Sequence, residues 1–121
     1  MNIEEYRDYC VSKVAVTESF PFDETTLVFK VMNKMFALTD VDLFQSINLK
    51  CDPEYAVELR EQYEGIIAGY HMNKKHWNTV SVNQDISDKM VYQLIDDSYN
   101  LIVNSLPKKD KLAFKELGGE L

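Results

Sequence analysis

Apolar residues recur along the chain at two spacings, one typical of helices and the other typical of strands. Ile3, Tyr6 and Cys10 lie three or four residues apart, which predicts an amphipathic helix over residues 3–13. A second helix is predicted to begin at Asp52-Pro53-Glu54, because Asp suits a helix cap and Pro suits the first helical position. Both helices would turn an acidic face to solvent.

A longer helical pattern lies near the end of the chain. Apolar residues repeat at helical spacing from about Ser87 to Ser105, and Pro107 is predicted to end this helix. We therefore expect a single domain over residues 1–107, followed by a charged tail over residues 108–121. A short helix in this tail would dock on the domain through Leu112, Phe114 and Leu117.

Residues rich in β-forming side chains predict two strands after the first helix. TLVFKV (26–31) and KMFALT (34–39) are separated by Met32-Asn33 alone, and this spacing predicts a tight hairpin. A type I′ turn needs positive φ at both central residues, a conformation that Met32 disfavours.

Two further segments alternate between apolar and polar residues. In DLFQSINLKC (42–51), the alternation predicts a half-buried strand with Leu43 on the inward face and Phe44 on the outward face. WNTVSV (77–82) alternates in the same way, with Val80 and Val82 inward. The complete pattern predicts an α+β domain of two layers, an antiparallel sheet with helices packed on one face.

Composition places the chain among soluble globular domains. The 121 residues are 45% hydrophobic and 27% charged. The polar, acidic start does not resemble a secretory signal, and no apolar run reaches the roughly 20 residues that span a bilayer. We therefore expect a cytoplasmic protein that does not enter membranes. Cys10 and Cys51 lie far apart in the sequence, so both are expected to be buried free thiols.

The charge of the chain is negative overall but unevenly distributed. Thirteen basic and twenty acidic residues give a net charge of −7, which disfavours nucleic acids and anionic membranes at long range. Residues 65–80 contain two lysines and no acidic residue, and so carry a local positive charge. This segment includes GYHMNKKHWNTV (69–80), which holds both histidines and the only tryptophan of the chain.

A nucleic-acid interface is the first hypothesis for this segment. Lysines interleaved with aromatic and amide side chains are suited to contact phosphates and to stack on bases. The strand residues predicted to share the sheet face opposite the core are Lys30, Lys34 and Lys50, with Asn48 and Phe36 nearby. The loop residues predicted to contact the ligand are His71, Asn73, Lys74, Lys75, His76 and Trp77. The hypothesis requires the five lysines to converge on one surface free of carboxylates.

Other interpretations of the same segment stay open. It could be structural, with Trp77 in the core, or it could bind a metal if ligands beyond its two histidines were close. A small-ligand or catalytic site would need a pocket at the histidines, and Cys51 paired with His71 or His76 is a conceivable nucleophile. The chain contains no Walker, GxGxxG, GxSxG or HExxH motif. We therefore expect no catalysis, cofactor or metal.

The acidic first helix is a separate candidate for function. Glu4 and Asp8 share a helix face that could hold a cation or contact a basic protein partner. A solvated acidic face is the simpler alternative.

Several stretches together resemble one protein family. VFKVMNKMFAL, INLKCDPE, LREQY, GYHMNKKHWNTV and SYNLIVNSLP occur in this order and are similar to the MmcQ/YjbR family of small bacterial proteins. The resemblance covers residues 20 to about 109 and implies a compact α+β fold of the type found in the bacterial frataxin CyaY. The resemblance also implies a proposed double-wing DNA-binding architecture, with DNA as the partner. The frataxin-like fold supports a different alternative, in which the acidic first helix binds a metal ion or another protein. The positions carried over are the loop and strand residues named above for the nucleic-acid interface.

Overall fold

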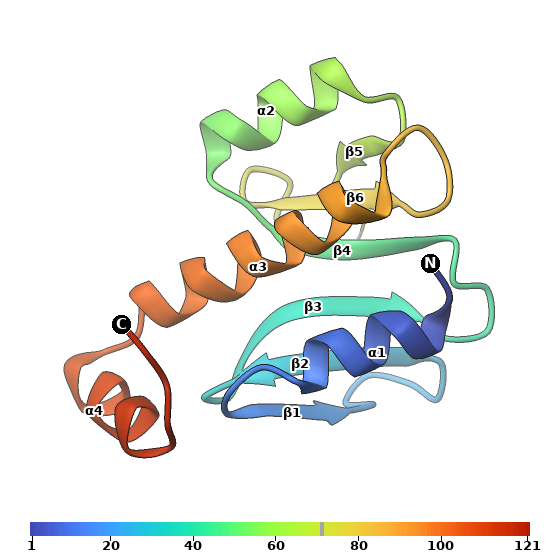
Figure 1. Ribbon diagram of the computed structural model, residues 1–121. Helices are drawn as coiled ribbons and strands as arrows, with labels where there is room; N and C mark the ends of the chain where they lie inside the picture. The colour runs from blue at the N-terminus through green and yellow to red at the C-terminus, as the bar shows by residue number, and fades with distance from the viewer. Residues whose placement is uncertain (71) are drawn as a thin grey trace.

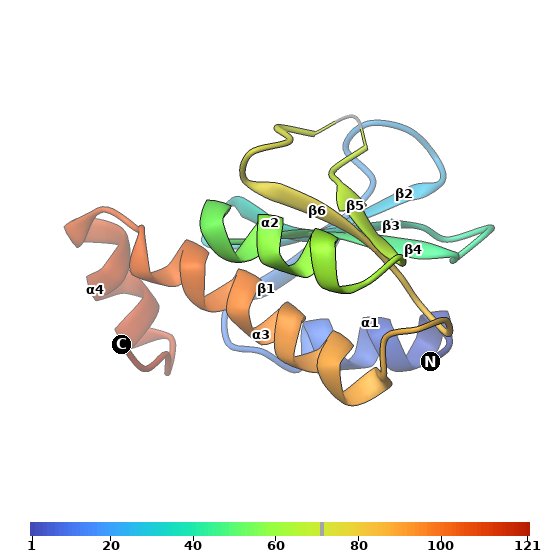
Figure 2. The ribbon, with the colours of Figure 1, turned by 90° about the horizontal axis from the view of Figure 1, so that it is seen from above.

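A six-stranded antiparallel sheet covered by helices on one face forms the body of the molecule (Figure 1). The computed structural model describes residues 1–70 and 72–121. The strands lie in the order β1-β2-β3-β4-β6-β5, and α1, α2 and α3 pack on the same side of the sheet (Figure 2). This arrangement confirms the predicted α+β fold. The elements are α1 (Ile3–Val11), β1 (Val16–Ser19), β2 (Thr26–Val31), β3 (Lys34–Asp40), β4 (Ser46–Lys50), α2 (Pro53–Gln62), β5 (Ile66–Ala68), β6 (Trp77–Ser81), α3 (Asp88–Asn104) and α4 (Lys108–Glu116).

Side-chain caps fix the helix starts that the sequence predicts. Asn2 and Glu5 form a reciprocal capping box at α1, in which Asn2 Oδ1 accepts from the Glu5 backbone N–H at 2.8 Å. The Asp52 carboxylate caps α2 and the Ser87 hydroxyl caps α3, each by accepting a backbone N–H of the first turn. Helix α1 ends at Val11, two residues before its predicted end.

The main core lies between the sheet and the three helices α1, α2 and α3. Aromatic rings meet edge to face inside it, with centroids 5.5 Å apart for Tyr6 and Phe29 and 5.4 Å apart for Phe36 and Tyr99. The strand residues predicted to point inward and found in this core are Ile47, Leu49, Cys51, Val80 and Val82.

The β2–β3 hairpin closes through the predicted two-residue turn. Met32 and Asn33 have φ values of 49° and 67°, and Val31 pairs directly with Lys34. Positive φ at both central residues is the type I′ geometry that matches the twist of paired strands. Because Asn tolerates this conformation, the strain of the turn is concentrated at Met32.

The sheet differs from the predicted strands in two ways. The sequence pattern does not predict the edge strands β1 and β5, and it starts β4 too early. Leu43 lies before β4 and is 66% exposed. Phe44 has a φ of 40° and packs on Tyr6, with ring centroids 5.5 Å apart. The alternation predicted over residues 42–51 therefore holds only from Ser46 onward, because the chain turns before that residue.

An irregularity in the β2–β3 pairing places Phe36 and Ala37 both on the core side of β3. Phe36, predicted near the face opposite the core, is therefore fully buried. The Ser98 hydroxyl of α3 bridges β3 and β4 at this point, because it donates to the Phe36 carbonyl at 2.6 Å and accepts from the Lys50 N–H at 2.9 Å. A helix side chain thus takes the place of a strand-to-strand hydrogen bond.

Helix α4 docks on the rest of the molecule through one apolar side chain. Phe114 is buried, with its ring centroid 6.3 Å from that of Tyr99. Leu112 and Leu117, predicted to dock beside it, are exposed instead. Within the described residues, the structure contains no helix that combines the length and the apolar character needed to cross a membrane.

Candidate nucleic-acid interface

The basic segment forms the loop between β5 and β6, which rises from the face of the sheet opposite the helices (Figure 2). We call the described residues of this loop, 69–70 and 72–76, the basic loop, and this side of the sheet the open face. The Gly69 N–H donates to the Trp77 carbonyl at 2.8 Å and closes the base of the loop. Glycine is required at this position, because a Cβ on Gly69 would lie 2.8 Å from the Trp77 Cβ and 2.9 Å from its carbonyl oxygen.

Asn73 folds the second half of the basic loop into a turn. Its carbonyl accepts from the backbone N–H groups of His76 and Trp77 at 3.2 and 2.9 Å, and its Oδ1 accepts from the Lys75 N–H at 3.0 Å. The His76 carbonyl in turn accepts from the Cys51 N–H at 2.8 Å, which ties the loop to the end of β4. Asn73 and the backbone of His76 therefore shape the loop.

A chain of hydrogen bonds connects the basic loop to the middle of the sheet. The Tyr70 N–H donates to Thr79 Oγ1 at 2.9 Å, and the Thr79 hydroxyl donates to Asn48 Oδ1 at 2.5 Å. Asn48 and Thr79 lie opposite each other in the β4–β6 pair. The backbone at Tyr70 is thereby held, while this residue is 65% exposed. His71, also predicted to contact the ligand, lies outside the described residues.

Trp77 is buried on the open face. It is only 8% exposed and forms a small cluster with Val28 and Leu38, against which Met35 and Met72 pack. Because Met72 belongs to the basic loop, the loop folds onto the part of the sheet that the helices leave uncovered. Trp77 therefore anchors the loop, and its ring offers little surface on which a base could stack.

The strand register separates the three lysines that were predicted to share one face. Lys50 lies opposite Trp77 and Lys30 lies opposite Met35, so both are on the open face beside the Trp77 cluster. Lys34 lies opposite Val31, whose side chain is in the main core, and therefore belongs to the helix-covered side. The prediction that the strand lysines share a face is wrong for Lys34.

Carboxylates are sparse on the open face but not beside the basic loop. Within the strands, all of which lie in the described part of the chain, Asp40 is the one acidic residue on this face. It pairs with Thr26, at the opposite end of β2 from Lys30. Lys75, however, lines the same hollow as Glu54 at the start of α2. The condition of a carboxylate-free surface is therefore met along the strands except at Asp40, and it is only partly met at the loop.

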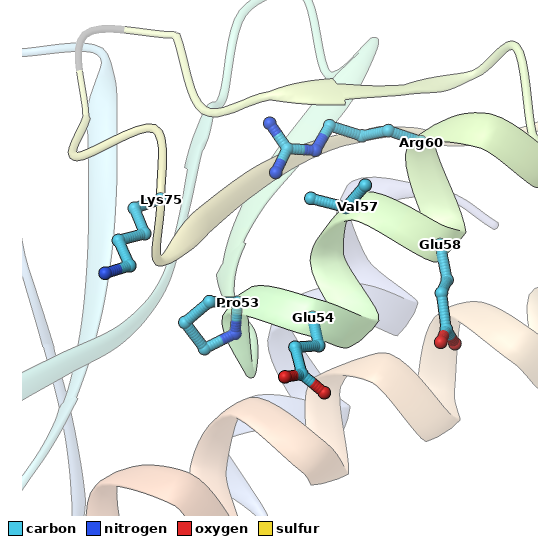
Figure 3. Close-up of a pocket in the computed structure, with 6 residues that line it drawn as sticks. All are labelled: Pro53, Glu54, Val57, Glu58, Arg60 and Lys75. Carbon is cyan, nitrogen blue, oxygen red and sulfur yellow. The ribbon is translucent and has the colours of Figure 1, made fainter.

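A hollow of about 650 Å³ lies between the basic loop and α2 (Figure 3). Its side chains come from Pro53, Glu54, Val57, Glu58, Arg60 and Lys75. The Arg60 guanidinium is held at its margin, because Nε donates to the Ala56 carbonyl at 3.1 Å and Nη1 to the Lys74 carbonyl at 3.4 Å. Arg60 is absent from the predicted contacts. The sequence does contain a signal for Arg60: within the stretch LREQY, it is the only basic residue of α2.

The thiols are poorly suited to nucleophilic chemistry. Burial and the adjacent Asp52 carboxylate raise the pKa of Cys51 to about 11, and burial raises the pKa of Cys10 to about 12. A thiol with so high a pKa carries little thiolate at neutral pH. Among the described residues, no three His, Cys, Asp or Glu side chains gather closely enough to hold a metal ion. Glu4 and Asp8 of α1 are exposed.

Known bacterial proteins are similar to nearly the whole chain. The YjbR family model matches residues 11–101. The uncharacterised protein YjbR of Escherichia coli K12 is 33% identical over 118 residues, which cover 97% of this chain and 100% of that protein. The uncharacterised protein YbdF of Escherichia coli O157:H7 is 41% identical over 93 residues, 76% of each chain.

Two solved structures share the fold. The crystal structure of a Deinococcus radiodurans protein has a TM-score of 0.89 and 36% identity, and the match covers 98% of this chain and 89% of that one. A crystal structure from Pseudomonas syringae has a TM-score of 0.71 and 32% identity, with 84% of this chain and 98% of that one covered. The fold described above is therefore the fold of these relatives.

Proposed function

The chain belongs to the YjbR family, and on that premise we propose that it binds nucleic acid through the basic loop and the lysines beside it. The surface assigned to this role, the loop face, consists of Tyr70, Lys74 and Lys75 on the loop with Lys30 and Lys50 on the open face. The Escherichia coli relatives are named as uncharacterised. The proposal therefore depends on this chain's own geometry, joined to the DNA-binding architecture that the family resemblance implies.

The main support for the proposal is that hydrogen bonds fix the backbone of the basic loop while its lysine side chains are exposed to solvent. Gly69, Asn73 and Trp77 hold the backbone through the hydrogen bonds described above. Lys74 and Lys75 are exposed, and the Lys74 ammonium also donates to the Gly69 carbonyl at 3.4 Å. A surface whose backbone is already ordered loses less conformational entropy when it binds. Lysine ammonium groups suit phosphate contacts, and an exposed tyrosine ring suits a base.

The two layers of the molecule also separate much of its charge. The acidic residues of α1 lie in the helix layer, whereas Lys30 and Lys50 lie on the open face. A nucleic acid on the open face would have the sheet between it and α1. Because the Debye length is about 8 Å at physiological ionic strength, the solvent-exposed charges of α1, on the far side of the molecule, repel a ligand on the open face only weakly. A net charge of −7 is therefore compatible with binding on this side.

Fluorescence anisotropy with labelled DNA and RNA oligonucleotides at several salt concentrations tests the proposal. Lys74→Ala/Lys75→Ala removes two phosphate contacts, so we expect weaker binding. The slope of log K against log salt should fall by about 1.4 for a single strand or about 1.8 for a duplex. Lys108→Ala/Lys109→Ala on α4 is the matched control, because it removes the same charge outside the loop face.

The control variant should bind as the wild type does, with circular dichroism confirming that both variants fold. Equal losses in the two variants would indicate a general charge effect and would contradict the proposal. Absence of binding by the wild type at about 100 μM, the range of non-specific affinity, would also contradict it.

A further inference from the structure

The hollow between the basic loop and α2 combines an apolar floor with two cations. Pro53 and Val57 form the floor, and Val57 is 47% exposed. Figure 3 shows Arg60 and Lys75 on the loop side of this floor, with Glu54 and Glu58 extending away from the loop. The basic side of the hollow is therefore the side that faces the proposed loop face.

Both cations are available to an anion. In the part of the chain that the structure describes, neither Arg60 nor Lys75 has a carboxylate within ion-pair distance. The carbonyls of Ala56 and Lys74 fix the Arg60 guanidinium through Nε and Nη1, and Nη2 has no bond to another described residue. A planar guanidinium held in this way suits a phosphate group, and an ammonium adds a second positive charge.

We propose that this hollow seats one unpaired nucleotide of a single-stranded nucleic acid. Its phosphate lies between Arg60 and Lys75, and the face of its base lies on Pro53 and Val57. The inference rests on the proposed function and names the class of nucleic acid that the loop face binds. It adds Arg60, Pro53 and Val57 to the surface.

Two observations favour a single strand over a duplex. The hollow is shallow and open to solvent, and a base can lay its face on the floor only when it is not stacked between neighbours. A duplex also carries about one charge per 1.7 Å of axis. The exposed carboxylates of α2 that line the hollow, Glu54 and Glu58, would repel this charge density more strongly than that of a single strand.

Two substitutions test the hollow without changing the residues of the loop face. Val57→Asp puts a carboxylate on the apolar floor, so we expect single-strand binding to weaken by about tenfold, since like charges would be juxtaposed. Arg60→Gln should lower the slope of log K against log salt by about 0.7, the effect of one lost phosphate contact. Val11→Asp on α1, at a residue that is 36% exposed, is the matched control.

Anisotropy is measured with a single strand and with a blunt hairpin duplex of the same sequence. We expect the wild type to prefer the single strand, and Val57→Asp but not Val11→Asp to lose that preference. In a second measurement, adding a nucleoside monophosphate should shift the Arg60 Nε–H signal in a ¹H–¹⁵N spectrum.

The outcomes separate the two proposals. If Lys74→Ala/Lys75→Ala weakens binding but Val57→Asp and Arg60→Gln bind as the wild type does, the hollow is not used and this inference fails alone. Equal affinity for single strand and duplex would also overturn it. If the wild type binds no oligonucleotide, the proposed function fails together with the inference.

Discussion

The single hydroxyl group of Ser98 acts both as a hydrogen-bond donor and as a hydrogen-bond acceptor in the middle of the sheet. The hydroxyl donates to the Phe36 carbonyl and accepts from the Lys50 N–H, at a position where β3 and β4 do not bond directly. It is fully buried, so water cannot take its place without opening the core. The same residue fixes α3 against the strand that ends in Lys50, one of the lysines of the loop face.

We expect Ser98→Ala to lower the free energy of unfolding by about 1–3 kcal/mol, because two buried backbone groups lose their partner. Urea titration followed by circular dichroism measures this loss. Ser105→Ala is the matched control, since the Ser105 hydroxyl also donates to a backbone carbonyl, that of Ile102, but Ser105 is exposed. Its loss of stability should stay within about 0.5 kcal/mol. Equal losses in the free energy of unfolding for the two variants would show that the Ser98 bridge does not contribute to stability.

At the scale of elements, α1 and α3 are joined by a polar contact at the margin of the core. Asp96 Oδ1 accepts from the Tyr9 hydroxyl at 2.6 Å and from Lys13 Nζ at 2.5 Å. The Lys13 ammonium also lies 4.9 and 5.0 Å from the ring centroids of Tyr9 and Tyr99. Since the Lys13 side chain is only 17% exposed, its charge depends on these partners.

We expect Asp96→Asn to destabilise the protein more than the double variant Lys13→Met/Asp96→Asn does. The single substitution leaves a partly buried ammonium without its anion, whereas the double substitution removes the charge as well. A double-mutant cycle from urea titrations should give a coupling energy of about 0.5–3 kcal/mol. A coupling energy near zero would mean that the ion pair is no stronger than an exposed one.

At the scale of the whole molecule, buried thiols and phenols link stability to alkaline pH. Burial raises the pKa of Tyr9 to about 12, as it does for Cys10, and it also raises the pKa of Tyr6 well above its usual value. In an unfolded chain, thiols ionise near pH 8.5 and phenols near pH 10. Above these values the unfolded state has lost protons that the folded state keeps. The stability is therefore complete below about pH 8.5 and falls as the pH rises toward 12.

Cys10→Ala tests this linkage. Between about pH 9 and pH 10, the free energy of unfolding of the wild type should fall more steeply than that of the variant, by up to about 1.4 kcal/mol per pH unit. Val91→Ala, which opens a cavity in the same core without removing a titratable group, should lower stability at every pH and keep the wild-type slope. An unchanged slope in Cys10→Ala would mean that the Cys10 thiol ionises at its ordinary pH.

Features with local signals were predictable from the sequence, and features that depend on distant contacts were not. Capping residues mark the starts of three helices, and the spacing at Met32-Asn33 marks the hairpin. The hairpin register also implies that Lys34 shares a face with Val31, so this error could have been avoided. The edge strands are short and depend on pairing with β2 and β6. The hollow depends on how the basic loop packs against α2, and no sequence pattern specifies that contact.

Both free edges of the sheet are short, with four residues in β1 and three in β5. A long row of unpaired N–H and C=O groups is what allows the sheet of one molecule to continue into that of another. Here each edge offers only a few such groups, and β1 carries Glu18 among hydroxyl side chains. A filament or shared sheet is therefore disfavoured by the architecture itself. An assembly of several copies is therefore expected to rely mainly on side-chain contacts.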